Sequence, residues 1–192
     1  MKYDLSQKIT RGAQRTLNNF SNELLYLISI KNFNLITVNE ICSHANYPRA
    51  TFYNYFDDKY DLLNYAFHTI AKELQPDLDK ESHQYQILDE YFEEIYDLFS
   101  SESSFIKKVL QHNNYDDTLI QSFIIFLQNI VQKIFYSQLN KNTEKESPEI
   151  PLDLLADHYS NTLLLIFDWA FLRGHQVSKK EAKDYLNLLL KN

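Results

Sequence analysis

Residues that make turns, and cysteines, are scarce in this chain of 192 residues. Two glycines and four prolines provide too little turn chemistry for a protein of many strands. The single cysteine, Cys42, cannot form a disulfide within the chain, so the cysteine content gives no sign of an oxidising compartment. Fully apolar runs are short as well, and residues 163–167 fall far below the length that spans a bilayer. These absences predict an all-α protein of the cytoplasm with no membrane partner.

Charge is distributed unevenly along the sequence. The whole chain has 26 acidic and 19 basic side chains, which gives a formal net charge of −7. Residues 1–56 run against this balance, with six Lys or Arg residues and three Asp or Glu residues. A modestly basic first part on an acidic remainder favours local binding of phosphates and excludes indiscriminate binding of polyanions. Only the first part is therefore expected to touch nucleic acid.

The first two predicted helices are marked by periodicity and by a capping box. Apolar residues recur three and four positions apart over residues 9–30, as one face of a helix requires. Thr37 then stands three residues before Glu40, so that Thr37 can cap the amide of Glu40 while the carboxylate reaches back. A short helix over 38–45 should follow. The apolar face of the first helix consists of Ile9, Ala13, Leu17, Phe20, Leu24, Leu27 and Ile28.

A tight break separates the second helix from a third. Asn46 is one of the few non-glycine residues that tolerate a left-handed backbone, and Pro48 suits the first position of a helix. The third helix is expected over 48–55, with Phe52 and Phe56 on its inner side. Three helices with a short turn before the last predict a helix-turn-helix unit, which places its last helix in the major groove of DNA.

The rest of the chain is predicted to be helical. Asp57 or Asp58 should cap a connecting helix that covers residues 57–75. The domains are then a DNA-binding head at 1–56 and a larger effector-binding and dimerisation body at 76–192, with about nine helices in all. The further helices are expected at 84–100, 103–113, 116–140, 152–173 and 179–190.

The last two predicted helices favour a homodimer. The second half of 152–173 is apolar nearly all round, and such a helix must be covered on every side. Only the short helix 179–190, opened by the capping box of Ser178 and Glu181, remains to cover it. A second copy of the chain is the better cover, with two helices from each subunit forming a four-helix arrangement.

Residues 37–63 resemble the DNA-binding region of the TetR family of bacterial transcriptional regulators. The resemblance implies an all-helical subunit, dimerisation through the last two helices and an effector pocket inside the body. It covers about the first third of the chain. The matching positions are Thr37, Ile41, Ala45, Thr51, Tyr53, Tyr55, Phe56, Lys59, Leu62 and Leu63.

The same resemblance implies a set of DNA-binding residues. Thr37 would contact a phosphate, the first residues of the third helix would enter the major groove, and two later residues would touch the backbone. Asn46 replaces the usual turn glycine, and Ala50 stands where glycine is common before Thr51, so base preference cannot be transferred. The groove set is Arg49, Ala50, Thr51 and Tyr53, the backbone set is Tyr55 and Lys59, and Asn39 and Asn54 lie where side chains can also reach DNA.

Side-chain chemistry supports these roles independently. Arg49 could pair with guanine O6 and N7 and discriminate by about 1–3 kcal/mol, although a phosphate contact is an equal alternative. Ala50 and Thr51 offer apolar contact to a thymine methyl. Tyr53, Tyr55 and Lys59 are better suited to phosphates, which fix register. Paired heads about 34–36 Å apart, or a multiple of that distance, predict a palindromic operator on double-stranded DNA.

The body offers aromatic side chains and no catalytic constellation. Ordinary core packing explains most of its rings, and a pocket for a small apolar or aromatic effector is the functional alternative. The six histidines include no pair four residues apart, so no metal or other cofactor is expected. The carboxylates of 89–97 are interpreted as a solvated helix face, and no enzyme is predicted. Candidate effector residues are Tyr96, Phe99, His112, Phe126, His158 and Phe167.

Three functions are left open at this point. The first is a ligand-responsive repressor. The second is a transcriptional activator or co-regulator whose body answers to another protein. Its motif is Trp169, Gly174, Ser178 and Glu181, which resembles a subgroup tied to dihydroxyacetone kinase operons. The third is a small-molecule carrier or enzyme with a vestigial head.

Overall fold

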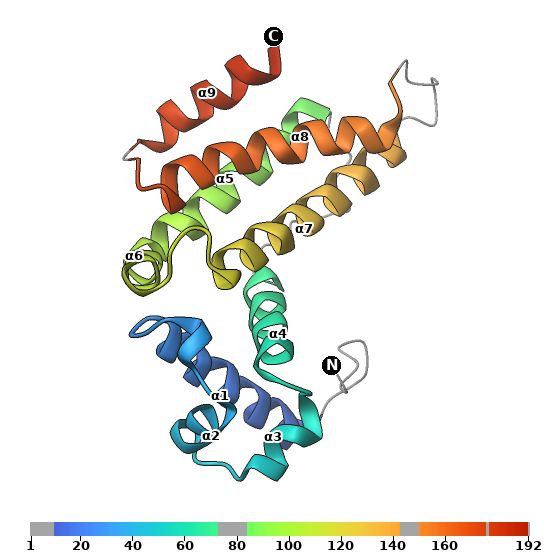
Figure 1. The fold of residues 1–192 in the computed structure, drawn as a ribbon. Helices are drawn as coiled ribbons and strands as arrows, with labels where there is room; N and C mark the ends of the chain where they lie inside the picture. The colour runs from blue at the N-terminus through green and yellow to red at the C-terminus, as the bar shows by residue number, and fades with distance from the viewer. Residues whose placement is uncertain (1–9, 73–83, 143–149, 176, 192) are drawn as a thin grey trace. The chain divides into compact units, whose positions relative to one another are not determined.

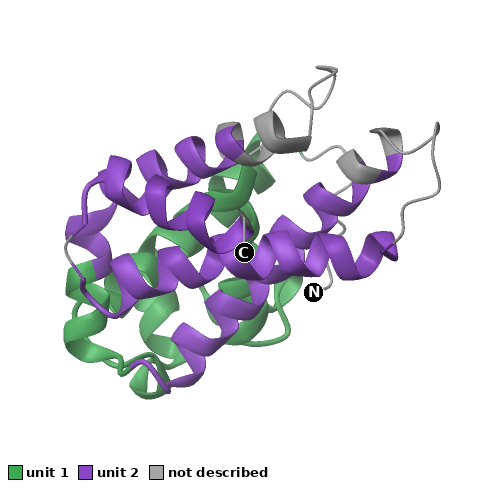
Figure 2. Ribbon diagram, turned by 90° about the horizontal axis from the view of Figure 1, so that it is seen from above, with its two compact units in different colours: residues 1–73, 107–114 green, residues 74–106, 115–192 purple. Residues whose placement is uncertain are grey.

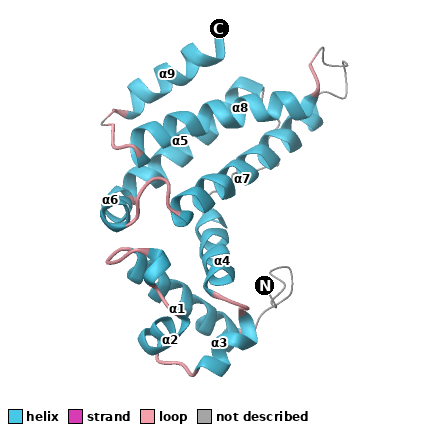
Figure 3. Ribbon diagram, in the orientation of Figure 1, coloured by secondary structure: helices cyan, strands magenta, loops and turns pink. Residues whose placement is uncertain are grey.

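The computed structural model describes residues 10–72, 84–142, 150–175 and 177–191. Throughout these ranges the regular structure is helical and no strand occurs, which confirms the all-α prediction (Figure 3). Figure 1 shows the elements in chain order. They are α1 (Arg11–Ile28), η1 (Phe33–Leu35), α2 (Val38–Ala45), α3 (Arg49–Tyr55), α4 (Lys59–Ala71), α5 (Gln84–Ser101), α6 (Ser103–His112), α7 (Thr118–Asn142), α8 (Leu152–Phe167), the π-helical turn η3 (Asp168–Leu172) and α9 (Lys179–Lys191).

The chain divides into two compact units (Figure 2). The head unit comprises residues 1–73 and 107–114, and the body unit comprises residues 74–106 and 115–192. Helix α4, which was expected to connect the two parts, clusters with the head. Helix α6 is shared, since its residues from 107 onward belong to the head unit. The domain boundary predicted at residue 56 therefore stays a prediction.

Aromatic rings fill the interior of the head unit. Helix α1 packs against both α2 and α4. Phe20 of α1 is fully buried, and its ring meets those of Phe52 and Phe56 edge-on, with centroids 5.4 and 6.4 Å apart. Phe52 and Phe56 were predicted to share the inner side of α3, and both have no exposed surface. Burial of these rings turns the rest of the short helix α3 outward.

The ends of the head helices follow their capping residues. The Thr37 hydroxyl accepts from the Glu40 amide at 3.2 Å, and Asp58 accepts from the amides of Tyr60 and Asp61. Asn46 has φ +55°, the left-handed conformation that the turn was expected to need. One detail is wrong: both oxygens of Glu40 accept from the Lys31 ammonium, at 2.8 and 2.7 Å, where the capping box requires a return to Thr37.

The body unit is built on a long antiparallel pair. Helices α7 and α8 pack along each other, and α9 packs on α8 (Figure 1). Phe167 of α8 stacks on Phe92 and Phe99 of α5, with centroids 5.4 and 5.5 Å apart. The predicted capping box of α9 is present in both directions, because Ser178 Oγ accepts from the Glu181 amide and the Glu181 carboxylate accepts from Ser178. Ring stacking therefore fixes α8 against α5, and the capping box fixes the start of α9.

Helix α8 is not covered on every side within one chain. Leu163, Ile166 and Phe167 are buried, but the side chain of Leu165 is 52% exposed. The helix also ends in the π-turn η3, where the Arg173 amide donates to the Asp168 carbonyl, and Gly174 follows with φ +77°. The single chain therefore leaves part of this apolar helix open to solvent.

Helix α7 is also strongly apolar. Between Thr118 and Ser137 it is long and apolar enough to cross a membrane, with a mean hydropathy of 1.3, and 28% of that window is buried. The expectation of no membrane rested on uninterrupted apolar runs, which this helix lacks. One such helix is weak evidence, because core helices of soluble proteins pass the same test. Here Gln128 and Gln132 donate to side chains of α8, which gives the helix a packing role.

Candidate nucleic-acid interface

The predicted DNA-binding residues lie on the outer side of α2 and α3 and at the start of α4. Their positions follow from the burial of Phe52 and Phe56, which fixes the inner side of α3. None of the nine side chains is buried. Those of Thr37, Asn39, Arg49, Ala50 and Asn54 are exposed, and those of Thr51, Tyr53, Tyr55 and Lys59 are half-buried.

Arg49 and Tyr53 form a pair one turn apart on α3. The Arg49 guanidinium donates to the Tyr53 hydroxyl at 3.1 Å and lies 5.6 Å from the centre of its ring. The hydrogen bond to Tyr53 raises the pKa of Arg49 further, so this cation stays charged. A guanidinium has several N–H donors, so a bond to one hydroxyl keeps donors for a second acceptor. Arg49 can therefore meet a base edge or a phosphate.

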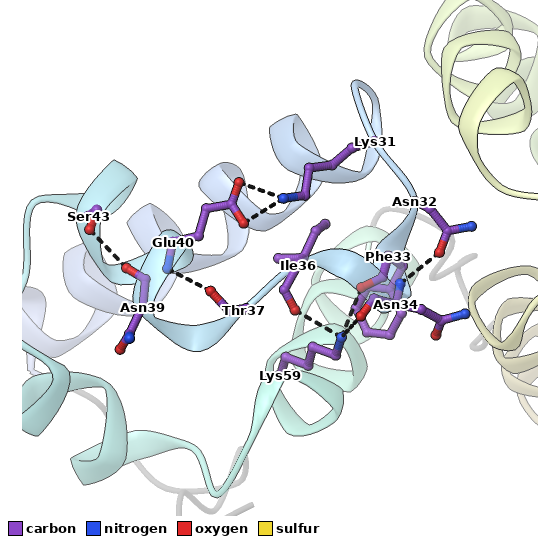
Figure 4. A network of polar contacts seen from close by, with 10 residues as sticks. All are labelled: Lys31, Asn32, Phe33, Asn34, Ile36, Thr37, Asn39, Glu40, Ser43 and Lys59. Carbon is purple, nitrogen blue, oxygen red and sulfur yellow. Dashed lines mark hydrogen bonds and ion pairs between the residues drawn. The ribbon is translucent and has the colours of Figure 1, made fainter.

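The Lys59 ammonium is bound within the protein, whereas its predicted role is a contact with the DNA backbone. Its ammonium donates to the carbonyls of Phe33, Asn34 and Ile36 at 2.9, 3.0 and 2.9 Å (Figure 4). It also lies 4.7 Å from the centre of the Phe33 ring. Three carbonyls match the three donors of an ammonium group. Burial, followed by repulsion from Lys31, lowers the pKa of Lys59.

The loop before α2 is held by a second cation, which sequence reasoning missed. Lys31 bridges to Glu40 in the first turn of α2 (Figure 4). The hydrogen bond from Lys31 is the largest cause that lowers the pKa of Glu40. A lysine shortly before a capping box was the available signal, but periodicity gives no information about partners in a loop. Lysines thus hold both ends of the segment 31–36, because Lys31 binds Glu40 and Lys59 binds the Ile36 carbonyl.

The candidate effector residues do not form one group. Tyr96, Phe99 and Phe167 are buried together in the body unit, where the rings of Tyr96 and Phe99 both lie near that of Phe167. His112 is exposed and belongs to the head unit. His158 of α8 is exposed, and Phe126 of α7 is half-buried. The three buried rings are the part of the set that the body brings together.

Metal-binding groups are missing from the described residues, where no three His, Cys, Asp or Glu side chains cluster as ligands. Cys42 is buried in the head, and burial raises the pKa of its thiol, which disfavours the thiolate that metals bind. The exposed hydroxyl, amide and guanidinium groups on α2 and α3 are suited to hydrogen bonding with an extended polar partner.

Residues 25–66 match the family model described as bacterial regulatory proteins of the tetR family. This part of the head is therefore similar to the DNA-binding domain of the TetR family. The match contains all of α2 and α3 and every proposed DNA-binding residue, which confirms the resemblance seen in residues 37–63. No curated protein sequence matches the chain.

Solved structures of transcriptional regulators share the fold over nearly the whole chain. A TetR transcriptional regulator from Streptococcus agalactiae is 21% identical, with a TM-score of 0.66 and coverage of 93% of this chain and 96% of that one. The dihydroxyacetone kinase operon activator DhaS is 20% identical (TM-score 0.57, coverage 92% and 94%). FadR from Bacillus subtilis, in complex with stearoyl-CoA, is 14% identical (0.60, 90% and 96%). The chain has the fold of a TetR-type transcriptional regulator from head to body.

Proposed function

We propose that this protein is a sequence-specific DNA-binding repressor that acts as a homodimer on a palindromic operator and responds to a small effector. The observation that carries the proposal is the outer side of α3. Arg49, Thr51 and Tyr53 face away from a core of phenylalanines, in a segment that matches the TetR model. A short helix that served only to pack in a protein core would not be expected to carry such side chains on its outer side.

The division of work on this surface follows from the contacts. Arg49 keeps donors for guanine O6 and N7, while Ala50 and Thr51 suit a thymine methyl. Thr37, Tyr53 and Tyr55, with Asn39 and Asn54 at the margin, serve phosphates and register. Lys59 acts on the protein itself, because its donors are directed to three carbonyls.

Selection from a pool of random duplexes tests the DNA-binding part even though the operator sequence is unknown. We expect enrichment of an inverted repeat whose half-sites lie one helical turn, or a multiple of it, apart. Thr51→Asp is the matched control, since a carboxylate on the outer side of α3 repels phosphates and leaves the core intact. Enrichment of no sequence, or equal enrichment by the Thr51→Asp variant, would contradict the proposal.

Exposed apolar residues on α8 and α9 support the dimer. Leu154 and Leu165 on α8, and Leu188 and Leu189 on α9, are each about half exposed or more in the single chain. Obligate dimer surfaces are apolar in this way, and a twofold axis places the same patch on both subunits. We therefore propose that the segments 152–173 and 179–190 of two chains form the interface.

Sedimentation equilibrium tests the dimer with a matched pair of variants. Leu188 of α9 and Ile125 of α7 are exposed to nearly the same extent, 60% and 57%. Leu188→Glu should give a monomer, because it places a carboxylate in the proposed interface. Ile125→Glu should remain a dimer. Dimers of the Leu188→Glu variant, or monomers of wild type, would show that the interface lies elsewhere.

An effector site in the body is proposed around Tyr96, Phe99 and Phe167. These rings provide the apolar lining that small-molecule sites use, and the Tyr96 hydroxyl, which donates to the Val177 carbonyl, is a polar group within the cluster. The first probes are stearoyl-CoA, which the FadR neighbour holds, and planar aromatic compounds. A true effector raises the unfolding midpoint and lowers operator affinity in the same concentration range.

The activator or co-regulator hypothesis has a structural observation in its favour, the match to DhaS, itself an operon activator. In that case the body would bind a protein, and no compound in a metabolite panel should shift the unfolding midpoint. A shift by any compound, together with release of operator DNA, would decide for the repressor. The carrier or enzyme hypothesis would need turnover of a substrate by the purified chain.

A further inference from the structure

Asn113 is a buried amide far outside the segment that matches the TetR model. It follows α6, is 1% exposed, and belongs to the head unit although 47 residues separate it from the end of the matching segment at residue 66. Buried amides in proteins are hydrogen-bonded, and the identity of their partners shows what they hold in place. In this case the partners lie in the loop between α1 and α2.

The amide of Asn113 uses both its acceptor and its donors. Its Oδ1 accepts from the Phe33 amide at 2.8 Å, and its Nδ2 donates to the carbonyls of Ile28 at 3.1 Å and Val109 at 3.0 Å. Next to it, the Asn32 side chain donates to the His112 carbonyl at 3.1 Å. Asn113 thus joins the end of α1 to the start of η1. Only an amide presents an acceptor and two donors in this way.

Phe33 is held from both sides of its backbone. Its amide donates to Asn113 Oδ1. Its carbonyl accepts from the Lys59 ammonium (Figure 4). Its ring is buried and makes a cation–π contact with the same ammonium. The short helix η1 is therefore clamped between a side chain at the end of α6 and a side chain at the start of α4.

The segment 28–36, which Asn113 and Lys59 hold, leads directly into the proposed DNA surface. Lys59 also binds the carbonyl of Ile36, the residue before Thr37, and Thr37 caps α2 and is a proposed phosphate contact. Lys31, from the same segment, binds Glu40 in the first turn of α2. We therefore expect a shift of this segment to move the N-terminus of α2.

We propose that Asn113 is a positioning residue for DNA binding: it fixes the segment 28–36 and thereby sets the place of Thr37 against a phosphate. The proposal rests on the proposed function. Asn113 is buried, so it would not touch DNA itself. Its influence passes through Phe33, Ile36 and Thr37, and a change at Asn113 should therefore be felt only where Thr37 can still make its contact.

A double-mutant cycle with Asn113→Ala and Thr37→Val tests this path. Operator affinity is measured well below the unfolding midpoint of every variant, on the duplex selected by wild type. Asn113→Ala should weaken binding about tenfold, the cost of one displaced charge-assisted hydrogen bond. In the Thr37→Val background the same change should have little further effect, because the two residues act on one contact. Additive losses, or no loss from Asn113→Ala, would overturn the proposal.

Two further variants separate positioning from loss of stability. Leu63→Ala removes buried volume from α4 and leaves the hydrogen bonds of Asn113 in place, so it should lower the midpoint without weakening binding of the folded protein. If Asn113→Ala does not fold, Asn32→Ala gives the answer, since Asn32 is only half-buried and donates to the His112 carbonyl. Equal affinity of the Asn32→Ala variant and wild type would then overturn the proposal.

Hydrogen exchange gives a readout at the contact itself. The Phe33 amide donates to Asn113 Oδ1, so its exchange should quicken in Asn113→Ala and stay slow in Leu63→Ala. Unchanged exchange at Phe33 would also overturn the proposal. Failure of wild type to select any duplex would remove the proposed function and this inference together, whereas selection by wild type with an unaffected Asn113→Ala variant would remove this inference alone.

Discussion

The head and body units both have cores of aromatic rings, but local signals set more of the geometry in the head. In the head, polar residues at helix ends set the geometry, with Thr37 and Asp58 as caps and Asn46 in a left-handed turn. In the body, stacked rings such as Phe99 and Phe167 fill the space between long helices. Caps act locally and determine which side chains face outward, whereas ring packing is set by distant partners. A functional surface can therefore be predicted from the head sequence far more directly than a pocket can be predicted from the body.

The strongest way to break this contrast is to remove one ring from each unit. Phe20→Ala should lower the free energy of unfolding by about 3–5 kcal/mol, because a fully buried ring leaves a cavity, and Phe167→Ala should cost a similar amount. Chemical denaturation followed by circular dichroism measures both. Operator binding should be lost with Phe20→Ala at temperatures where Phe167→Ala still binds. Equal losses of binding would mean that the two cores are not separate.

A second variant asks whether Lys59 belongs to the interior or to the DNA surface. Lys59→Met keeps the aliphatic stem and leaves the carbonyls of Phe33, Asn34 and Ile36 without their shared donor. The free energy of unfolding should fall by about 3 kcal/mol, since hydrogen bonds to a charged group are among the strongest. Unchanged stability in denaturant melts, with weakened DNA binding, would return Lys59 to the phosphate role predicted from the family.

Arg49 should behave in the opposite manner. Arg49→Ala should weaken operator binding by about 1–3 kcal/mol and relax the preference at one base position, because a paired contact to guanine is lost. Stability should hardly change, as the side chain is exposed and its hydrogen bond goes to Tyr53 on the same helix. Fluorescence anisotropy with a series of operator variants measures both effects. A uniform loss over all sequences would indicate a phosphate contact.

The smallest expected effect is that of pH on the Lys31–Glu40 pair. The pKa of Glu40 is lowered in the folded head, so the pair adds stability above the ordinary pKa of a glutamate, and this is lost as the pH falls from about 5 to about 3. Both side chains are partly exposed, which keeps the contribution below about 1 kcal/mol. Unfolding midpoints of wild type and Glu40→Gln should converge at acid pH. A constant difference would exclude the carboxylate as the cause.

Helix positions could be predicted from the sequence because caps and periodicity are local signals. Helix α2 has the predicted bounds, and α9 opens with the expected box of Ser178 and Glu181. The outward side of α3 was also predictable, because Phe52 and Phe56 lie one turn apart and both seek the interior. The roles of the outward side chains toward DNA stay predictions.

Partners that meet only in the folded chain could not be predicted. Lys59 binds carbonyls 23 to 26 residues earlier, and Asn113 binds Phe33 at a separation of 80 residues. Backbone carbonyls leave no mark in a sequence, so neither contact had a signal. His112 was grouped with body aromatics by residue type alone, but it ends the part of α6 that belongs to the head. The return bond of Glu40 was expected from its spacing, and a nearby lysine took its place.

Because the Lys59 ammonium is bound inside the head, it affects how strongly DNA binding should depend on salt concentration. Each phosphate that a cation neutralises releases counterions, and the logarithm of affinity then falls by about 0.9 per phosphate for each tenfold rise in ionic strength. A cation directed at three carbonyls adds nothing to that slope. Hydroxyl contacts, such as those proposed for Thr37 and Tyr55, carry no such penalty. A head of this kind should hold its own site over a wide range of potassium concentrations and dwell only briefly on random DNA.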